Sequence, residues 1–226
     1  MMDFIKDDVK IKLLFPTVLY QANLELQQEE IDSIKSENYQ RKDQTNWWIS
    51  QRTDLHLKYE SLMSTINKHV DFYCKEVLQL VDTNLSCSVS WVNKLSKGDG
   101  SPRHSHTYSM VSGVLYLDVP DNSGDIAFYT PNMMFGNFFR TSTKEENDFN
   151  TGLNLFTTVK VKTGLLLLFP SVLEHSVIRN ESDSDRYSFA FDYICDGNFN
   201  SISIEPTYKK LKNEFFERSE EHTSEL

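Results

Sequence analysis

The sequence predicts a mainly β (α+β) domain with a β-sandwich or jelly-roll core and helices packed on one outer face. Two observations lead to this prediction. From residue 86 onward, short runs rich in Val, Leu, Phe and Tyr alternate with clusters of Gly, Pro, Asn and Asp, a pattern typical of proteins built from many short strands. Before residue 86, one long segment has helical apolar spacing. The chain has 226 residues, of which 39% are hydrophobic and 12% aromatic, so it is able to bury such a core.

The segment before the β region is predicted to contain two helices. Gln27–Ser36 is short, polar and rich in Glu, and is predicted to be a surface helix. Tyr59–Val81 is the clearest helix, because apolar side chains recur in it at spacings of three and four. Leu13–Tyr20 is expected to be extended, and Asn46–Leu57 irregular. The apolar stripe of the longer helix consists of Leu62, Ile66, Val70, Tyr73, Val77 and Leu80. Cys74 lies beside this stripe and is expected to be a core residue.

Seven strands are predicted in the rest of the chain, and glycine-, proline- or asparagine-containing turns separate most of them. The predicted strands are Cys87–Leu95, Met110–Asp118, Asp125–Tyr129, Leu153–Val161, Leu165–Phe169, Glu174–Arg179 and Arg186–Ile194.

Composition and charge exclude several classes of protein. The longest apolar run, Leu165–Pro170, is the size of a strand, so no membrane span is expected. The formal charge of −10 argues against a general nucleic-acid binder, since such proteins need clustered Lys and Arg. The three cysteines, Cys74, Cys87 and Cys195, are far apart, which excludes a CxxC motif and indicates a reducing compartment. Residues 1–8 lack an apolar signal-peptide core, so we expect a cytoplasmic protein.

The last nine residues are expected to be foreign to the natural protein. Arg218–Leu226 (RSEEHTSEL) resembles the in-frame translation of a common sequencing-library adapter. We therefore leave it out of the fold prediction. The chain shows neither an internal repeat nor a low-complexity linker, so residues 1–217 are predicted to form a single domain.

Three histidines are candidate metal ligands. His104 and His106 flank Ser105, and side chains two residues apart on an extended chain point to the same face. His175 follows a strongly apolar strand, and in a jelly roll a late strand can lie beside an early one. Histidine is the commonest metal ligand, but this spacing alone is a weak signal, since scattered histidines are also common.

The strand at Arg186 alternates between two kinds of residue. Its aromatic positions, from Tyr187 to Tyr193, form one face and indicate packing against a core. Arg186, Ser188, Ala190 and Asp192 form the other face, which looks inward in a closed sandwich. A buried Arg is costly unless it meets an anion. Its planar fork suits a carboxylate ligand that Ser188 can share, but pairing with an internal Asp explains it equally well.

Several segments in this order resemble the iron(II)/2-oxoglutarate-dependent oxygenase superfamily, and most closely a bacterial and phage branch of it. The segments are HSHTYSMVSGVLYL, PDNSGDIAF, GLLLLFPSVLEHSV and RYSFAF, with WVN and LLFPTVLY upstream. Each piece is weak by itself, but the order and spacing are specific. The resemblance covers nearly all of residues 1–217.

This resemblance implies a double-stranded β-helix, a form of jelly roll, and a site for Fe(II) and 2-oxoglutarate. It implies that a closely spaced ligand pair and a distal histidine hold the iron, which here are His104, His106 and His175. Arg186 lies eleven residues after His175, which fits the arginine that grips the distal carboxylate of 2-oxoglutarate. Ser188 matches the serine of the same pattern, and Tyr116 matches a tyrosine that supports that carboxylate. Asn93 is a candidate for contact with the other end of the co-substrate.

The sequence departs from the family pattern at the second iron ligand. Most of the superfamily has HxD or HxE, which gives two histidines and one carboxylate, whereas this chain has His106. Three alternatives follow: a three-histidine site, a carboxylate supplied by Asp125, or a His106 that does not bind iron and leaves a position open. We favour the three histidines. Val172 and Asp192 stand where Trp and Asn are common, and are expected to tune packing or substrate fit.

The predicted function is therefore that of a 2-oxoglutarate-dependent dioxygenase, most simply a hydroxylase, of bacterial or phage origin. It would couple O2 and 2-oxoglutarate decarboxylation to C–H oxidation of a small molecule or a protein side chain. One rival is a cupin-type three-histidine dioxygenase that does not use 2-oxoglutarate. The other is a jelly-roll binding module without activity. The substrate and the oligomeric state do not follow from the sequence.

Two further features bear on the substrate. The loop Pro131–Gly152 is long for a compact domain and rich in Met and Phe, so it is a candidate for substrate contact. Alternatively, this loop has no binding role and either extends away from the domain or folds onto its own core. Trp47 and Trp48 would either line the edge of a substrate cleft or anchor the N-terminal segment on the core.

Overall fold

The computed structural model describes residues 3–6, 9–12, 16–42, 47–80, 84–131, 156–196, 198–199 and 202–203. Of the candidate substrate loop Pro131–Gly152, only Pro131 belongs to these residues. The adapter-like tail Arg218–Leu226 lies entirely outside them.

The described residues form two helices, two short helical turns and fifteen strands. The helical elements are α1 (Gln28–Lys35), η1 (Leu55–Leu57, a 3₁₀ turn), α2 (Glu60–Phe72) and η2 (Tyr73–Val77, a π-helical turn). The strands are β1 (Asp3–Lys6), β2 (Val9–Lys12), β3 (Tyr20–Asn23), β4 (Tyr39–Arg41), β5 (Trp48–Ser50), β6 (Asn84–Leu95), β7 (Ser101–His104), β8 (Val111–Asp118), β9 (Ile126–Tyr129), β10 (Phe156–Val159), β11 (Leu165–Pro170), β12 (His175–Val177), β13 (Arg186–Asp196), β14 (Asn198–Phe199) and β15 (Ile202–Ser203).

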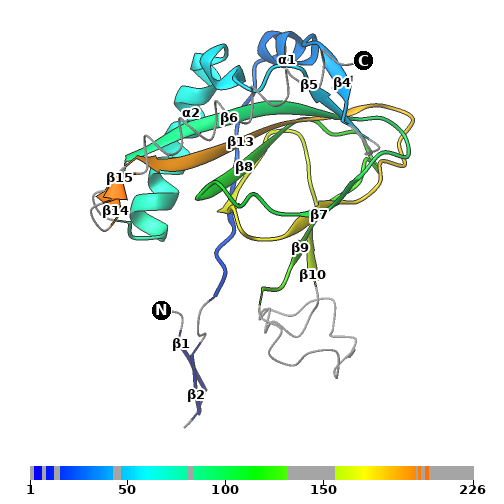
Figure 1. The fold of residues 1–226 in the computed structure, drawn as a ribbon. Helices are drawn as coiled ribbons and strands as arrows, with labels where there is room; N and C mark the ends of the chain where they lie inside the picture. The colour runs from blue at the N-terminus through cyan, green and yellow to red at the C-terminus, as the bar shows by residue number, and fades with distance from the viewer. Residues whose placement is uncertain are drawn as a thin grey trace, which may run out of the picture.

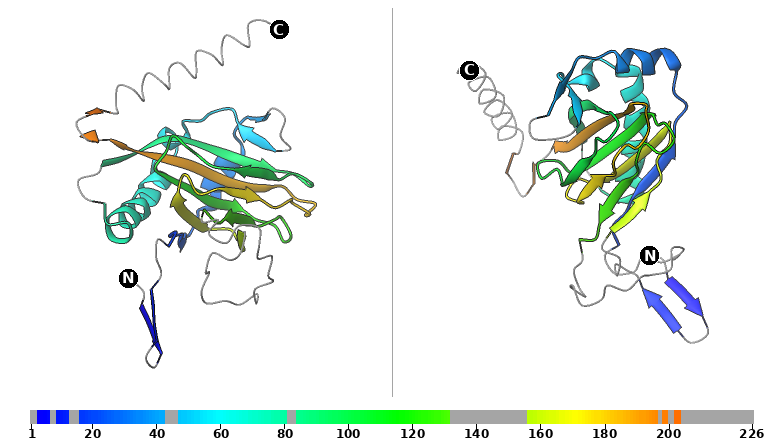
Figure 2. Two further views of the ribbon diagram at one scale, coloured as in Figure 1. Left: turned by 60° about the horizontal axis from the view of Figure 1, so that its bottom comes forward. Right: turned by 90° about the vertical axis from the view of Figure 1, so that its right-hand side faces the viewer.

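Two antiparallel sheets form the core (Figure 1). The larger sheet has the strand order β3-β11-β8-β13-β6-β5-β4, and the smaller has the order β10-β9-β12-β7. Several neighbours in both sheets are distant in sequence, as β13 pairs with both β6 and β8, and β12 pairs with both β7 and β9. Figure 2 shows the long strands of the larger sheet side by side. The predicted jelly-roll core is confirmed.

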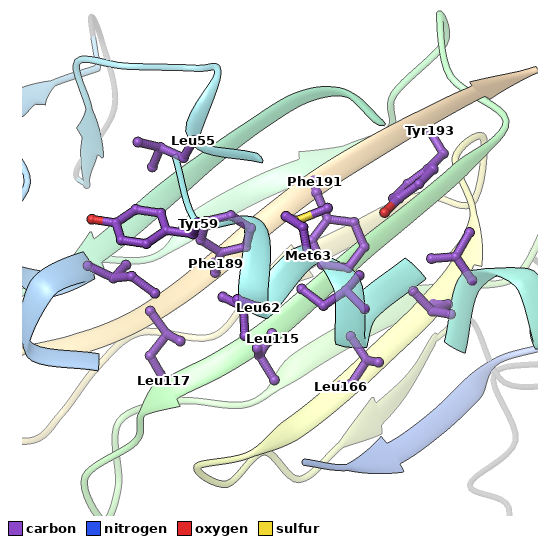
Figure 3. Close-up of a cluster of buried hydrophobic side chains, with 14 of the residues drawn as sticks. Leu55, Tyr59, Leu62, Met63, Leu115, Leu117, Leu166, Phe189, Phe191 and Tyr193 are labelled. Atoms are coloured by element: carbon purple, nitrogen blue, oxygen red, sulfur yellow. The ribbon is translucent and has the colours of Figure 1, made fainter. Parts of the chain in front are cut away.

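The helices cover the outer face of the larger sheet (Figure 1). Figure 3 shows Leu62 and Met63 of α2 against Leu115 and Phe191 of the sheet, and all four side chains are buried. Burial of one such side chain stabilises the fold by about 1.5–3 kcal/mol. In the structure, α1 and α2 thus lie outside the β core.

Strands β8 and β11 are buried on both faces, which explains their nearly continuous apolar sequence. On β8, Leu115 and Leu117 pack towards the helices, whereas Val114 and Tyr116 face the space between the sheets. The run Leu165–Phe169 of β11 divides its side chains between the two clusters in the same way. The cluster between the two sheets, which includes Val114 and Leu167, forms the apolar base beneath the functional side chains.

The structure differs from the expected elements in several places. The helix predicted for 59–81 is α-helical only to Phe72 and continues as the π-helical turn η2. A π-helical turn contains more residues than an α-helical turn, which rotates the side chains that follow away from the α-helical stripe. Val77 is therefore exposed although Tyr73 and Cys74 are buried. The segment expected to be irregular contains β5 and η1. Strand β7 was not predicted, since its sequence SPRH has no apolar alternation.

No helix in the described part of the chain combines the length and the apolar character needed to cross a membrane.

Candidate active site

Strand pairing brings the three predicted histidines together. His104 is the last residue of β7 and lies directly opposite His175 of β12 in the register of the smaller sheet. His106 follows two residues later, and its backbone N–H donates to the carbonyl of Ser171, just beyond β11. The ring centroids are 4.3 Å apart for His104 and His175, 5.4 Å for His104 and His106, and 5.3 Å for His106 and His175.

Each imidazole has an acceptor at Nδ1. The Nδ1 atom of His104 lies 2.8 Å from the carbonyl oxygen of Pro102, and that of His175 lies 2.9 Å from the carbonyl oxygen of Leu173. Because a carbonyl oxygen only accepts, both Nδ1 atoms carry the proton, and each Nε2 keeps a free lone pair. One nitrogen from each of the three histidines fits within a cluster 4.8 Å across. This donor set fits a transition metal such as iron.

Burial favours the neutral form of His104 and His175. It lowers the pKa of His175 to about 4, with a further lowering from the neighbouring His104. It also lowers the pKa of His104, although the Pro102 carbonyl opposes the shift. Neutral imidazole is the form that binds metals, so the site is poised to bind a cation near neutral pH.

Arg186 is a buried cation with incomplete partners. Its side chain is among the most deeply buried of the described residues, with a relative exposure of 1%. Nη1 donates to the carbonyl oxygens of Gly124 at 2.6 Å and Ser123 at 3.4 Å, whereas Nε has no hydrogen-bond partner. None of the ion pairs formed by the described residues includes it, and burial lowers its pKa. No Asp or Glu of the described residues forms an ion pair with the guanidinium, although Asp125 acts on it at longer range. A buried guanidinium without an ion pair calls for an anion.

The other three predicted co-substrate residues surround the same position. Ser188 of β13 pairs in register with Asn93 of β6 on one side and with Tyr116 of β8 on the other. The Tyr116 ring centroid lies 5.2 Å from the guanidinium carbon of Arg186, a cation–π distance. Burial raises the pKa of Tyr116 to about 12, so its hydroxyl stays protonated and is able to donate.

All seven predicted site residues line one cavity of about 730 Å³. The inward face of β13 spans it, with Arg186 and Ser188 towards one end and Ala190 and Asp192 towards the other. A strand rises about 3.3 Å per residue, so Ser188 and Asp192 are about 13 Å apart along the strand. The cavity therefore has a cationic end and a histidine end, with room for a small dicarboxylate between them.

The carboxylate nearest the histidines is Asp192, which the sequence analysis assigned to packing or substrate fit. Its Oδ1 and Oδ2 lie 2.8 Å and 3.0 Å from Nδ1 of His106. Asp125, the alternative ligand, is not among the residues that line the cavity. Its Oδ1 instead accepts the backbone N–H of Val161. The alternation of β13 already put Asp192 on the same face as Arg186, and that was the available signal.

Comparison with known families agrees with this geometry. Residues 89–192 match the family model described as "Putative 2OG-Fe(II) oxygenase". Over those residues the chain is similar to the 2OG-Fe(II) oxygenases. The matched segment contains all seven predicted site residues, and the family name states the two predicted cofactors, iron(II) and 2-oxoglutarate. The prediction of the family and of its oxygenase class is therefore confirmed. No curated protein matches the chain.

Solved structures support the fold assignment. A 2OG-Fe(II) oxygenase-family oxidoreductase from Burkholderia pseudomallei is 10% identical with a TM-score of 0.53, over 79% of this chain and 84% of that one. HygX from Streptomyces hygroscopicus, solved with nickel and 2-oxoglutarate bound, is 13% identical with a TM-score of 0.52, over 78% and 82%. The epimerase SnoN from nogalamycin biosynthesis is 14% identical with a TM-score of 0.55, over 79% and 78%. At these identities the likeness shows the fold, which is the double-stranded β-helix of the 2OG-Fe(II) oxygenases.

Two tryptophans that line the cavity extend the site beyond the predicted set. Trp47 is buried, with 8% exposure, and lines the cavity, so one member of the Trp47–Trp48 pair does border the cleft. The ring centroid of Trp91 lies 5.7 Å from that of His106. Trp91 therefore forms part of the cavity wall at the histidine end.

Proposed function

We propose that this protein is an iron(II)- and 2-oxoglutarate-dependent hydroxylase in which His104, His106 and His175 hold the iron. The single observation that carries the proposal is the shared cavity, which has three convergent imidazoles at one end and the unpaired buried Arg186 at the other. Three imidazoles alone would fit many metal sites, and a buried arginine alone would fit many anions. An anion that also reaches the metal accounts for both features together.

In this proposal the co-substrate lies along β13. Arg186 binds the distal carboxylate of 2-oxoglutarate through Nε, which has no protein partner among the described residues, with Ser188 and Tyr116 as further donors. Asn93 pairs in register with Ser188, so it contacts the co-substrate beside Ser188 rather than at its other end. Bound iron(II) would supply the oxidising chemistry, in which 2-oxoglutarate becomes succinate and CO2 and one oxygen atom of O2 enters a C–H bond of the substrate. The protein orients the reactants and excludes water with its apolar base.

The substrate is proposed here by its chemical class. We propose a small molecule or a protein side chain that enters past Trp47 and Trp91, since the cavity is larger than 2-oxoglutarate needs. We also propose that residues 1–217 act as one domain in a cytoplasmic protein of bacterial or phage origin. The three cysteines of the chain, Cys74, Cys87 and Cys195, are all described and form no disulfide, which agrees with a reducing compartment.

An anaerobic titration with iron(II) and then 2-oxoglutarate tests the proposal. A 2-oxoglutarate chelated to iron(II) gives a visible charge-transfer band, which we expect in the wild-type protein and expect to lose in Arg186→Ala. Arg179→Ala is the matched control, because Arg179 is exposed and outside the cavity. It should leave the band unchanged.

The same experiment separates the rivals. The three-histidine donor set specifically favours the cupin-type dioxygenase, for which iron would bind but 2-oxoglutarate would produce no band. A binding module without activity would take up no iron at all. Either result overturns the hydroxylase proposal.

A further inference from the structure

Asp192 has a place in the site that the family pattern does not provide. It stands on β13 opposite Ser112 of β8, and its side chain is 8% exposed. Its two carboxylate oxygens lie 2.8 Å and 3.0 Å from Nδ1 of His106. His106 in turn occupies the position where most of the superfamily has a carboxylate ligand. The chain therefore has both groups, a histidine and a carboxylate, one behind the other.

The carboxylate is held in place by a network of hydrogen bonds. The hydroxyl of Ser112 donates to Oδ1 of Asp192 at 2.6 Å and lies 2.9 Å from the hydroxyl of Ser171. The carbonyl of Ser171 accepts the backbone N–H of His106, and the N–H of Ser171 donates to the carbonyl of Met110. Ser112 and Ser171 are each 1% exposed. The loop that carries His106 and the carboxylate behind it are thus fixed relative to each other.

His106 differs from the other two histidines in what its Nδ1 meets. His104 and His175 donate to neutral backbone carbonyls, whereas His106 donates to a carboxylate. A charged acceptor makes the stronger hydrogen bond and increases the basicity of the opposite nitrogen. Three neutral imidazoles would leave a bound divalent ion with its full charge, and Asp192 places one negative charge directly behind one of them.

We propose that Asp192 is a positioning residue that acts on the metal through His106 and supplies the charge that a carboxylate ligand would otherwise bring. This inference rests on the proposed function, since it requires His106 to bind the metal. Asp192 itself is not a ligand here, because it faces Nδ1, and the group of converging ligand atoms found among the described residues contains only the three histidines.

Metal affinity tests this proposal without turnover. Cobalt(II) is the probe, because its visible absorption reports both binding and coordination. Asp192→Asn keeps the shape and an acceptor but removes the charge, so the dissociation constant for cobalt(II) should rise tenfold or more. Asp118→Asn is the matched control: it removes a carboxylate from β8 that pairs with Lys35 instead. Its affinity should stay within twofold of the wild type.

A second background distinguishes an effect through His106 from a general structural effect. In a His106→Asp protein the introduced carboxylate would bind the metal directly, and Asp192→Asn should then leave the cobalt(II) affinity unchanged or improve it. An equal loss in both backgrounds would overturn the proposal, and so would Asp192→Asn binding cobalt(II) as tightly as the wild type. If the wild-type protein binds no cobalt(II), the proposed function fails instead.

A third variant covers the case in which Asp192→Asn does not fold, judged by near-UV circular dichroism of the metal-free protein. Ser112→Ala keeps the carboxylate and removes only its hydroxyl donor. The cobalt(II) dissociation constant should then rise about threefold to tenfold, and an unchanged constant would contradict the role assigned to Asp192.

Discussion

Single residues divide the cavity into two ends with opposite requirements. At one end, His104 and His175 are neutral donors whose Nδ1 protons are held by backbone carbonyls. At the other end, Arg186 is a buried cation without a counter-ion among the described residues. A buried charge without a partner costs several kcal/mol, and a fold keeps such a group when a ligand supplies the opposite charge. The co-substrate is that ligand in the proposed function.

Tyr116→Phe should weaken 2-oxoglutarate binding and leave iron binding intact. The phenyl ring keeps the packing and the contact with Arg186, and only the hydroxyl is lost. One hydrogen bond contributes about 1 kcal/mol, so the dissociation constant of 2-oxoglutarate should rise about threefold to tenfold. Anaerobic titration of the charge-transfer band measures it. A loss of iron(II) affinity in this variant would contradict the assignment of Tyr116 to the carboxylate end.

The residue-level prediction from sequence succeeded where one strand carries the signal. The alternation of β13 identifies Arg186 and Ser188 as inward-facing, and they are buried in the cavity wall. The contact between Asp192 and His106 spans 86 residues and depends on the register of β13 against β8. A sequence does not contain that register explicitly, so the contact was missed.

At the scale of elements, the packing of β13 against β8 determines where the site residues point. Phe191 lies directly opposite Gly113 in the register of the two strands. A Cβ atom at position 113 would come within 2.1 Å of the Phe191 ring, and within 2.8 Å of Leu168. The ring therefore lies where a side chain would otherwise stand. Ser188 and Asp192 lie on the opposite face of β13 and line the cavity, so the contact between Phe191 and Gly113 also helps to fix the position of this part of the cavity wall.

Gly113→Ala should destabilise the protein through overpacking. Such insertions cost about 1–3 kcal/mol, and for a chain of this size 1 kcal/mol corresponds to about 2–4 °C in melting temperature. Thermal unfolding followed by circular dichroism measures the change. Phe191→Leu in the same chain should relieve part of the clash, so the double variant should lose less stability than the two single losses combined. Strict additivity would rule out the contact as the cause.

The elements themselves followed the sequence where the apolar pattern is strong. β8, β11 and β13 were predicted because each has a long apolar or alternating run. β7 was not, because SPRH is polar and contains a proline, which is tolerated at the edge of a sheet where β7 lies. The helix after Tyr59 was predicted too long, since periodicity does not reveal the π turn at 73–77.

For the whole molecule, the two sheets and the outer helices serve to bring distant segments to one cavity. β7 and β12 supply His104 and His175, the segment after β7 supplies His106, and β6, β8 and β13 supply the co-substrate residues. The jelly-roll architecture was predictable from many short strands and turns, whereas the grouping of the site residues was predicted from the resemblance to a known family. The order of strands within each sheet was not, because it is decided by long-range pairing.

Ligands that bind only the folded protein should stabilise the whole fold. Nickel(II) is a redox-inert probe, and at 100 times its dissociation constant it should add about 2.7 kcal/mol of stability. This corresponds to a rise of about 5–11 °C in melting temperature, which a chelator should reverse. 2-Oxoglutarate should raise the temperature further only when the metal is present. An equal rise in His104→Ala would show that the metal binds elsewhere.

The most direct test of the central claim is an anaerobic crystal structure of the protein with iron(II) and 2-oxoglutarate. We predict the metal on Nε2 of His104, His106 and His175, and the distal carboxylate of 2-oxoglutarate against the Nε atom of Arg186. A metal bound at other residues, or a 2-oxoglutarate whose distal carboxylate lies away from Arg186, would contradict the account.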